Sequence, residues 1–276
     1  MEYSSQNMLV VKLGGTEGVD FSAICQDVAA LAAAGQPLVL VHGGSAEANA
    51  LGEATGHPAQ FIISPSGHSS RYTDPQTLEV FIMAVNGKVN TLLVSQLQGM
   101  GVNALGLCGL DGRLMTAKRK EAIQGVQNGK RRIIRDDQSG KIEQVDAGLL
   151  RLLLQAGYVP VVAPLALGEK GEALNTDADR AAAMVAAALQ AETLLLLTAV
   201  PGLLRSFPDE NTLIPRLKAA QLEEAMGAAQ GRMKKKVLGA QEALQGGVKQ
   251  VVIADGRGSQ PISQALAGSG TWITAW

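Results

Sequence analysis

Residues 8–15 read Met-Leu-Val-Val-Lys-Leu-Gly-Gly, and residues 37–45 read Pro-Leu-Val-Leu-Val-His-Gly-Gly-Ser. Each stretch is a short apolar run that ends beside a pair of glycines. Short and nearly continuous apolar runs are typical of strands that are buried on both faces of a parallel sheet. Three more runs of this kind lie at residues 159–163, 193–198 and 248–254.

Ala-rich segments of helical length separate these runs, at residues 21–34, 75–98, 147–155, 178–190 and 231–245. Strands joined by helices predict an α/β fold, here a three-layer αβα sandwich around a mainly parallel sheet. Ligands of such sheets bind beyond the carboxyl ends of the strands. The residues that follow each strand are therefore the first candidates for a site.

Two polar regions interrupt the alternation of strands and helices. Residues 62–71 have turn chemistry and are interpreted as a loop. Residues 112–145 contain Asn128-Gly129 and Ser139-Gly140, which predict β-hairpins that project from the sheet. A boundary between two lobes is expected near residues 164–170.

The composition excludes several classes of protein. The chain has 276 residues, 46% of them hydrophobic, and a net charge of −1, which argues against a general nucleic-acid binder. No uninterrupted apolar run reaches the roughly 18 residues that cross a membrane, and the polar start of the chain does not resemble a signal peptide. Cys25 and Cys108 lack metal or redox spacing. We expect a cytoplasmic protein with reduced thiols and no membrane or nucleic-acid partner.

The two glycine pairs are candidate phosphate-binding elements. Glycine lets backbone N–H groups face an anion, and a helix that starts beside it adds positive potential. A glycine pair at the end of one strand is often only a turn. Two pairs at successive strand ends, Gly14-Gly15 after Lys12 and Gly43-Gly44, favour phosphate binding.

The common alternatives lack their motifs. The sequence has neither G-x-x-x-x-G-K-[ST] nor a G-x-G-x-x-G that opens a helix, which argues against P-loop and dinucleotide-binding folds. It has no H-E-x-x-H, and its three histidines are scattered, which argues against a zinc hydrolase. His57 and His68 are interpreted as turn-bonding or solvated histidines.

Three further segments carry polar side chains at predicted ends of elements. Residues 175–179, Asn-Thr-Asp-Ala-Asp, suit a helix N-cap, although a cap needs only one such residue. Residues 231–236, Gly-Arg-Met-Lys-Lys-Lys, read alone, are compatible with a solvated charge run. Residues 198–203 turn from a strand into a loop.

Taken in order, these motifs resemble the amino-acid kinase family. They are K-x-G-G, H-G-G, R-x-T-D at residues 71–74, N-x-[ND]-x-D and G-x-M-x-x-K. The resemblance covers residues 12–254, and within the family it points to the acetylglutamate kinase group. It implies the carbamate-kinase-like αβα fold, with an N-terminal acceptor-binding lobe that carries a dimer interface, a C-terminal ATP-binding lobe, and one continuous sheet. Here the lobes would be residues 1–165 and 166–276.

The resemblance also implies roles for single residues. Lys12 and Lys236 would flank the transferring phosphoryl group, and Asp179 would orient both lysines. Phosphate binding would fall to the backbone N–H groups of Gly14, Gly15, Gly43 and Gly44, the last two also reaching the acceptor. Arg71 and Asn175 would bind the acceptor, and Thr198 and Gly202 would border the adenine. The cofactors implied are ATP and Mg²⁺, with no direct protein ligand to the metal.

The acceptor is suggested by departures from the acetylglutamate kinase pattern. Ser45 replaces a third glycine, residues 64–70 form a different loop before R-x-T-D, and Ala199 stands where Asp is common. The first two departures resemble kinases that phosphorylate aminoadipate on a small acidic amino-group carrier protein (LysW), a step of lysine biosynthesis. Carrier-linked glutamate and free N-acetylglutamate, both of arginine biosynthesis, stay open as alternatives.

A basic cluster points to the same partner. Eight Lys or Arg residues lie between Arg113 and Arg135 against one acid, Glu121. Such a cluster could steer an acidic carrier or could be a solvated hairpin. The candidate docking residues are Lys118, Arg119, Lys120, Arg131 and Arg132. Arginine-inhibited acetylglutamate kinases resemble one another in an extra N-terminal helix that builds hexamers. The predicted first strand starts at residue 8 without such a helix before it, so the resemblance implies a homodimer.

Two other functions share this fold. A non-catalytic sensor would be expected to lose a catalytic lysine or the organising aspartate, yet Lys12, Asp179 and Lys236 are all present. A relative of carbamate kinase or uridylate kinase would not share the R-x-T-D motif. A kinase that makes an acyl phosphate is therefore the leading hypothesis.

Overall fold

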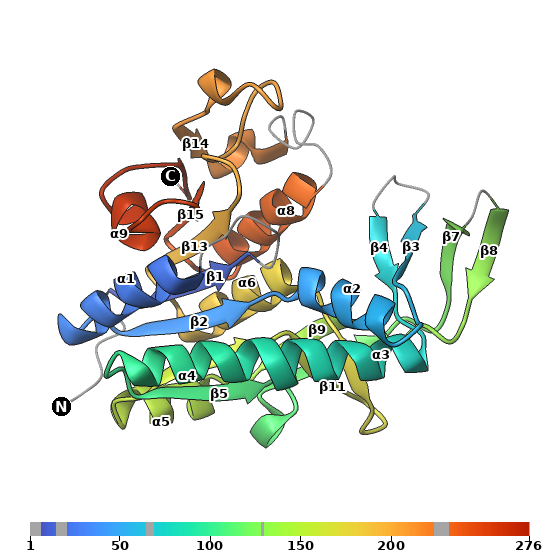
Figure 1. Cartoon of the computed structure of the whole chain (residues 1–276). Coiled ribbons are helices and arrows are strands. Elements are labelled where there is room, and N and C mark those ends of the chain that lie inside the picture. Colours follow the sequence, from blue (N-terminus) through green and yellow to red (C-terminus); the bar gives the residue numbers. More distant parts are fainter. Residues whose placement is uncertain (1–6, 15–20, 65–68, 128–129, 224–231, 276) are drawn as a thin grey trace.

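A computed structural model describes residues 7–14, 21–64, 69–127, 130–223 and 232–275. Its central sheet has eight strands in the order β14-β16-β15-β13-β1-β2-β10-β5 (Figure 1). All neighbouring pairs are parallel except β15 and β16. The strands are β1 (Leu9–Leu13), β2 (Leu38–His42), β5 (Ala104–Cys108), β10 (Val159–Ala163), β13 (Thr193–Thr198), β14 (Arg216–Lys218), β15 (Gln250–Asp255) and β16 (Thr271–Thr274).

Helices cover both faces of this sheet. One face packs against α1 (Phe21–Ala33), α4 (Thr91–Gly99) and α9 (Pro261–Leu266), and the other against α5 (Ala147–Gln155), α6 (Ala178–Leu189) and α8 (Arg232–Gln245). Figure 1 shows α1 and α4 on the opposite side of the strands from α5 and α6. The predicted three-layer αβα sandwich is thereby confirmed.

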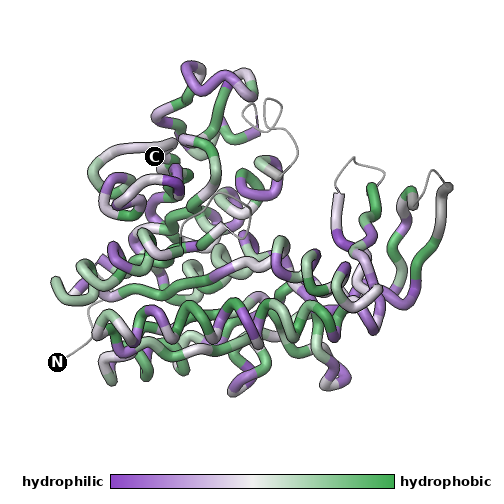
Figure 2. The backbone as a smooth tube through the Cα atoms, in the orientation of Figure 1, coloured by the Kyte–Doolittle hydropathy of each residue, from purple (hydrophilic) through white to green (hydrophobic). Residues whose placement is uncertain are grey.

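The alternation of strand side chains explains why two helical layers are needed. Val10 of β1 belongs to the core on the α6 side, whereas Leu9 and Val11 belong to the core on the α1 side. All three are fully or almost fully buried. Figure 2 shows the central strands as hydrophobic along their length, as expected when both faces are covered.

Two four-stranded sheets extend the molecule beyond the central sheet. One has the order β12-β11-β6-β9, with β6 (Met115–Arg119), β9 (Gly140–Val145), β11 (Leu165–Gly168) and β12 (Ala173–Asn175). The other has the order β4-β3-β7-β8, with β3 (Gln60–Ile63), β4 (Ser69–Tyr72), β7 (Ile123–Gln127) and β8 (Lys130–Ile134). Its two hairpins project side by side beyond α3 (Figure 1).

A long helical segment runs from α3 (Pro75–Phe81) through the π-helix η1 (Ile82–Asn90) into α4. By length and composition alone, the stretch Pro75–Gly99 could cross a membrane. Its buried side chains Val85, Val89 and Leu93 instead pack in the protein core. Another helix of the described chain is α2 (Ser45–Ala54), which follows β2. The described residues also form short 3₁₀ turns: η2 (Asp111–Arg113), η3 (Glu210–Thr212) and η4 (Ala219–Gln221).

Most predicted elements occur within two residues of their predicted ends. Of the hairpins expected between residues 112 and 145, β7 and β8 form one, although Asn128 and Gly129 lie outside the described residues. The hairpin expected at Ser139-Gly140 is wrong, because β9 pairs with β6 and not with β8. The loop predicted at residues 62–71 is wrong at both ends, because β3 and β4 pair through residues 60–63 and 69–72. Both proposed lobes contribute strands to the one central sheet, and the boundary at residue 165 stays a prediction.

Candidate active site

A cavity of about 470 Å³ opens beyond the carboxyl ends of β1, β2 and β13. Residues that follow these strands line it, among them Gly14, Gly44 and Thr198. The first residues of α2 and α6 and the early residues of α8 line it as well. Because helix N-termini carry partial positive charge, this arrangement suits an anion.

Lys12, Asp179 and Lys236 meet in this cavity, although they come from β1, α6 and α8. The Lys12 ammonium lies 2.8 Å from Asp179 Oδ1. The Lys236 ammonium lies 3.0 Å from Oδ1 and 3.1 Å from Oδ2 of the same carboxylate. All three residues are less than 10% exposed. Two cations thus share one anion, which leaves a net positive charge facing the cavity.

The surroundings shift the pKa values of this cluster. Burial would raise the pKa of Asp179, but the Lys12 and Lys236 ammonium groups outweigh it and hold that pKa well below its usual range. Burial lowers the pKa of Lys236, and Lys12 adds to the effect, while Asp179 opposes it. Asp179 is therefore ionised at neutral pH, as the counter-charge to the lysine pair requires.

The structure separates the helix cap from the ion pairs. Asp177 is the N-cap of α6, because its Oδ1 accepts hydrogen bonds from the backbone N–H groups of Asp179 and Arg180 at 3.0 and 3.2 Å. Its Oδ2 lies 3.3 Å from the Lys235 ammonium. Asp179 is consequently not needed as a cap. Lys234 and Lys235 line the cavity together with Lys236, so the basic segment is not merely a solvated face.

The glycine pairs fulfil only part of their predicted role. Gly14 and Gly44 line the cavity, and Gly15 lies outside the described residues. Gly43 lines the cavity as well, and its backbone N–H donates to Leu13 O at 3.1 Å, so its contact with phosphate or acceptor stays a prediction. Gly44 has a packing reason as well, since a Cβ there would lie 2.8 Å from Val85 Cγ2 of η1.

His42 supports the second glycine pair, Gly43-Gly44, through a hydrogen bond to its backbone. It is fully buried, and burial lowers its pKa to about 4, so its ring is neutral. Its Nδ1–H donates to Gly43 O at 2.7 Å, and Nε2 accepts from Asn90 Nδ2 at 2.9 Å. The same amide of Asn90 donates to Val161 O at 2.9 Å. The partners assign the tautomer and give His42 a structural role.

Arg71 reaches the same cavity from β4. Its guanidinium donates to Asn49 Oδ1 at 2.6 Å and to Ser45 O at 3.3 Å, and it lies 5.5 Å from the centre of the Phe61 ring. Phe61 also lines the cavity. Three contacts therefore hold the guanidinium in place before any ligand binds.

Asn175 lines the cavity at the end of β12. Its Nδ2 donates to Thr73 Oγ1 at 2.9 Å, which links it to the R-x-T-D segment. Asp74 of that segment caps α3 by accepting from Thr77 N at 2.7 Å. His57 contacts the Asp74 carboxylate and the Thr77 hydroxyl, as expected for a histidine that bonds a turn, whereas His68 lies outside the described residues.

Comparison with known proteins identifies the family of this chain. The model of the amino acid kinase family matches residues 7–255. The chain belongs to this family. It is 54% identical over 268 residues to [LysW]-aminoadipate kinase of Deinococcus radiodurans, with 97% of this chain and 92% of that protein covered. It is 51% identical to the enzyme of the same name from Thermus thermophilus, with 96% and 100% covered.

More distant relatives share the fold. An acetylglutamate kinase of Heliobacterium modesticaldum is 40% identical, with 92% of this chain and 86% of that protein covered. Among solved structures, N-acetylglutamate synthase from Neisseria gonorrhoeae has a TM-score of 0.79 at 29% identity, and this chain covers 59% of that longer protein. Carbamate kinase from Giardia has a TM-score of 0.70 at 16% identity, covering 98% and 99%, which shows the fold alone.

Within this amino acid kinase, Thr198 and Gly202 were predicted to border the adenine. Thr198 lines the cavity. A Cβ at Gly202 would lie 2.6 Å from Thr271 Oγ1 and 2.7 Å from Leu213 Cδ1. This close packing is a structural reason for the glycine, and its contact with the nucleotide stays a prediction.

The predicted docking residues lie in different environments. Lys118 is exposed, and Lys120 lines the cavity. Arg119 donates to the backbone carbonyls of Asp137 and Arg135 at 2.8 and 3.1 Å, so its guanidinium stabilises the kinase itself. Arg131 and Arg132 lie on β8, and their side chains are outside the described part of the structure.

Several cavity residues were not predicted. Asn49, Phe61, Lys141, Lys234 and Lys235 all contact Arg71 or line the cavity. Asn49 lies one helical turn after Ser45, a spacing that the sequence offered once α2 was placed. Nothing in the sequence marked Phe61, which directly precedes the segment predicted as a loop.

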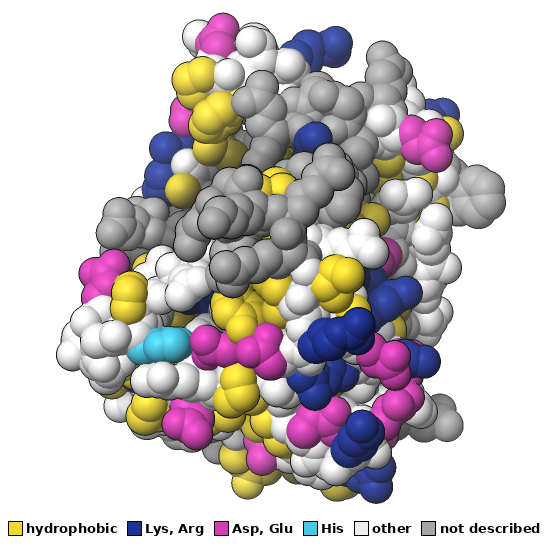
Figure 3. Space-filling model, turned by 90° about the vertical axis from the view of Figure 1, so that its right-hand side faces the viewer, with side chains coloured by type: hydrophobic (Ala, Val, Ile, Leu, Met, Phe, Trp, Pro, Cys, Tyr) yellow, Lys and Arg dark blue, Asp and Glu magenta, His cyan; other side chains and the backbone are white. Residues whose placement is uncertain are grey.

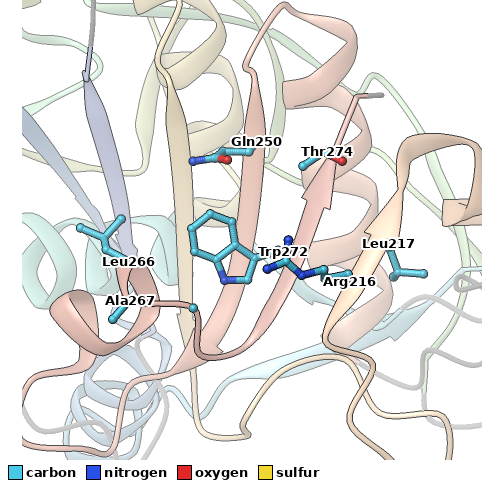
Figure 4. A pocket seen from close by; sticks show the side chains of 8 residues that line it. Arg216, Leu217, Gln250, Leu266, Ala267, Trp272 and Thr274 are labelled. Carbon is cyan, nitrogen blue, oxygen red and sulfur yellow. The ribbon is translucent and has the colours of Figure 1, made fainter.

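A second hollow of about 350 Å³ lies at the far edge of the central sheet, between β14, β16 and α9 (Figure 4). Arg216 and Trp272 lie beside each other there, with Gln250 and Thr274 nearby. Its lining includes one cation and no carboxylate. It therefore lacks the lysine and aspartate cluster that distinguishes the first cavity.

Proposed function

We propose that this protein is an ATP-dependent kinase that phosphorylates the side-chain carboxylate of carrier-linked aminoadipate in lysine biosynthesis. The observation that carries the proposal is the buried group of Lys12, Asp179 and Lys236 at the base of the cavity. The two [LysW]-aminoadipate kinases, at 54% and 51% identity over nearly the whole chain, support the choice of acceptor.

The chemistry needs cations more than it needs a base. A carboxylate is already a nucleophile, so its oxygen attacks the γ-phosphorus of ATP while the bond from that phosphorus to ADP breaks. The products are an acyl phosphate and ADP, and no proton moves. The obstacle is the repulsion between a carboxylate and a polyanionic nucleotide. Lys12 and Lys236 would stabilise the charge of the transferring group, and neutral His42 would take no part in proton transfer.

The phosphates would bind where the helix N-termini and glycines converge. Gly14 and Gly44 line the cavity close to the two lysines, and Lys234 and Lys235 add positive charge. Thr198 would border the adenine side. By resemblance, Gly15 and Gly43 would also contact phosphate, and Gly202 would border the adenine.

Magnesium fits this arrangement as an ion that arrives with the nucleotide. The two carboxylates that line the cavity, Asp177 and Asp179, are both paired with lysines. Among the described residues, no group of three or more His, Cys, Asp or Glu side chains could hold a metal. Mg²⁺ that arrives with the nucleotide would help to neutralise the negative charge of the phosphates during transfer.

The acceptor would bind between the projecting hairpins and α2. Arg71 would pair with its α-carboxylate, since a guanidinium matches a carboxylate with two parallel hydrogen bonds. Asn175 would contact its polar backbone. Phe61 would hold the guanidinium and cover the aliphatic chain of aminoadipate.

The carrier would dock beside the cavity mouth. Lys118 and Lys120 of the predicted set lie on or beside β6, and Lys141 of β9 also lines the cavity. Figure 3 shows Lys and Arg side chains gathered on this side of the molecule, with acidic side chains among them. A mixed surface of this kind can orient an acidic partner as well as attract it. The homodimer stays a prediction.

N-acetylglutamate and carrier-linked glutamate are the alternatives. The identity to an acetylglutamate kinase is 40%, against 54% to a [LysW]-aminoadipate kinase. The basic residues around the mouth also favour a protein-linked acceptor over a free amino acid.

A hydroxylamine trap for acyl phosphate tests the proposal. The protein would be incubated with ATP and Mg²⁺ and either carrier-linked aminoadipate, carrier-linked glutamate or N-acetylglutamate. We expect hydroxamate with carrier-linked aminoadipate at the highest kcat/KM. Preference for N-acetylglutamate or carrier-linked glutamate would move the enzyme to arginine biosynthesis. No hydroxamate with any of the three, while ATP still binds, would contradict the kinase itself.

A further inference from the structure

Asp137 is a buried carboxylate that the proposed reaction does not use. It lies between β8 and β9 and is 1% exposed. Its Oδ2 accepts the backbone N–H of Thr73 at 3.0 Å. Its Oδ1 accepts the backbone N–H of Ser139 at 2.8 Å and the hydroxyl of Ser139. The Asp137 carboxylate thus accepts hydrogen bonds from uncharged donors on two segments of the chain, one at Thr73 and one at Ser139.

These donors connect the two acceptor-side residues. Thr73 lies two residues after Arg71 on the chain leaving β4, and its Oγ1 accepts from Asn175 Nδ2 at 2.9 Å. Gln138, next to Asp137, donates its N–H to Thr73 O at 2.6 Å and accepts the N–H of Asn175 at 2.9 Å. The backbone of Arg71 and the side chain of Asn175 are thus joined through residues 137–139.

The geometry requires a carboxylate rather than an amide. Both oxygens of Asp137 accept backbone N–H groups, one on each side. An asparagine has one accepting oxygen, so its NH₂ group would face one of these N–H donors. A buried N–H without an acceptor is costly, and the segment that carries it would move away. Either Thr73 or Ser139 would shift.

We infer that Asp137 is a positioning residue that sets the spacing between Arg71 and Asn175, and thereby the fit of the acceptor. The inference rests on the proposed assignment of these two side chains to the acceptor. Asp137 contacts no reacting atom in this account. Its loss should weaken acceptor binding and leave nucleotide binding unchanged, because Lys12, Asp179 and Lys236 are held by other elements.

The test compares Asp137→Asn with a matched control, Asp27→Asn. Asp27 is a 4% exposed carboxylate that accepts the backbone N–H groups of Ile262 and Ser263 and the hydroxyl of Ser263. It has the same kinds of donor as Asp137, but both backbone N–H groups donate to Oδ2, and the residue fixes α1 to α9, away from the cavity. Asp27→Asn can keep both N–H bonds on its one amide oxygen, so it should lose less thermal stability than Asp137→Asn and serves as a control for replacing a buried carboxylate away from the cavity.

Steady-state kinetics then separate positioning from stability. For Asp137→Asn we expect the KM for carrier-linked aminoadipate to rise at least about tenfold, while the KM for ATP stays within about twofold. Asp27→Asn should change neither KM. Equal changes of both KM values in Asp137→Asn, or no change, would overturn the inference. A wild-type protein that forms no acyl phosphate with any acceptor would overturn the proposed function and this inference with it.

A second variant covers the case in which Asp137→Asn does not fold. Thr73→Val keeps the shape and the backbone N–H of Thr73 but removes the Oγ1 that accepts from Asn175. The KM for the acceptor should rise about threefold or more, again without a change in the KM for ATP. An unchanged acceptor KM would contradict the coupling of Asn175 to residues 71–74.

Discussion

At the phosphoryl end of the cavity (Lys12, Asp179, Lys236), full charges hold one another, with both ammonium groups within 3.1 Å of one carboxylate. At the acceptor end (Arg71, Thr73, Asn175), the hydrogen bonds run from the Arg71 guanidinium to Asn49, from the Thr73 N–H to Asp137, and from the Asn175 amide to Thr73. The phosphoryl end is built from core elements, and the acceptor end from residues at the smaller sheets. The difference suggests that the first end supplies transition-state stabilisation and the second supplies recognition.

The largest expected effect comes from removing a cation at the phosphoryl end. Lys236→Met should lower kcat about 10²–10³-fold, by analogy with the loss of one preorganised oxyanion donor. The KM for the acceptor should change little, because Arg71 and Asn175 are untouched. Initial rates of hydroxamate formation measure this, and Lys249→Met, at an exposed site, is the control. A loss that appears only in the acceptor KM would break the division between the two ends.

The pH dependence of stability tests the support of the second glycine pair. Burial lowers the pKa of His42 from 6.5 to about 4. Between these values the unfolded chain binds a proton that the folded chain does not, so stability falls as pH drops from 6.5 to 4. The shift corresponds to about 3 kcal/mol in the free energy of unfolding. Denaturant titrations at pH 7 and 4.5 should show this loss in the wild type, reduced in His42→Gln but not in His57→Gln.

A conservative change tests the acceptor end. Arg71→Lys keeps the positive charge but loses the planar fork that reaches Asn49 and a ligand carboxylate together. The KM for the acceptor should rise about ten- to hundredfold, since a charge-assisted hydrogen bond contributes about 1.5–3 kcal/mol. The KM for ATP should not change. A variant that matches the wild type would show that Arg71 does not bind the acceptor.

The smallest effect is expected at the docking surface. Lys118→Glu should raise the KM for carrier-linked aminoadipate about two- to fivefold at low salt, and added salt should erase the difference. The kinetics with N-acetyl-aminoadipate, which has no carrier, should be the same in variant and wild type. A change with both substrates would point to altered folding rather than to docking.

The sequence predicted the phosphoryl end better than the acceptor end. Lys12 lies near the end of the buried strand β1, and Asp179 and Lys236 lie near the starts of α6 and α8, where apolar patterns locate the elements and ordered motifs locate the side chains. Asp179 could be distinguished from a cap because buried lysines need a counter-charge, and the structure confirms that Asp177 is the cap. Nothing in the sequence indicated that the Gly43 N–H donates to Leu13 O at the end of β1, because that contact depends on the pairing of β1 with β2.

The acceptor end depends on contacts between distant segments. Asp137 and Thr73 are 64 residues apart, and Asn175 and Thr73 are 102 apart. Nothing local distinguishes Asp137 from its neighbour Asp136, whose carboxylate accepts a hydrogen bond from the Tyr72 hydroxyl at 2.7 Å. The pairing of β3 with β4 was missed because turn residues dominate the segment between them. Such contacts emerge only once the strand registers are known.

The most direct test of the two-ended account is the double variant Lys236→Met/Arg71→Lys. If the ends act separately, its loss of kcat/KM should equal the product of the two single losses, within about 0.5 kcal/mol in the activation free energy. A double variant no worse than Lys236→Met alone would contradict the account, because it would show that the lysine pair and the arginine act as one unit.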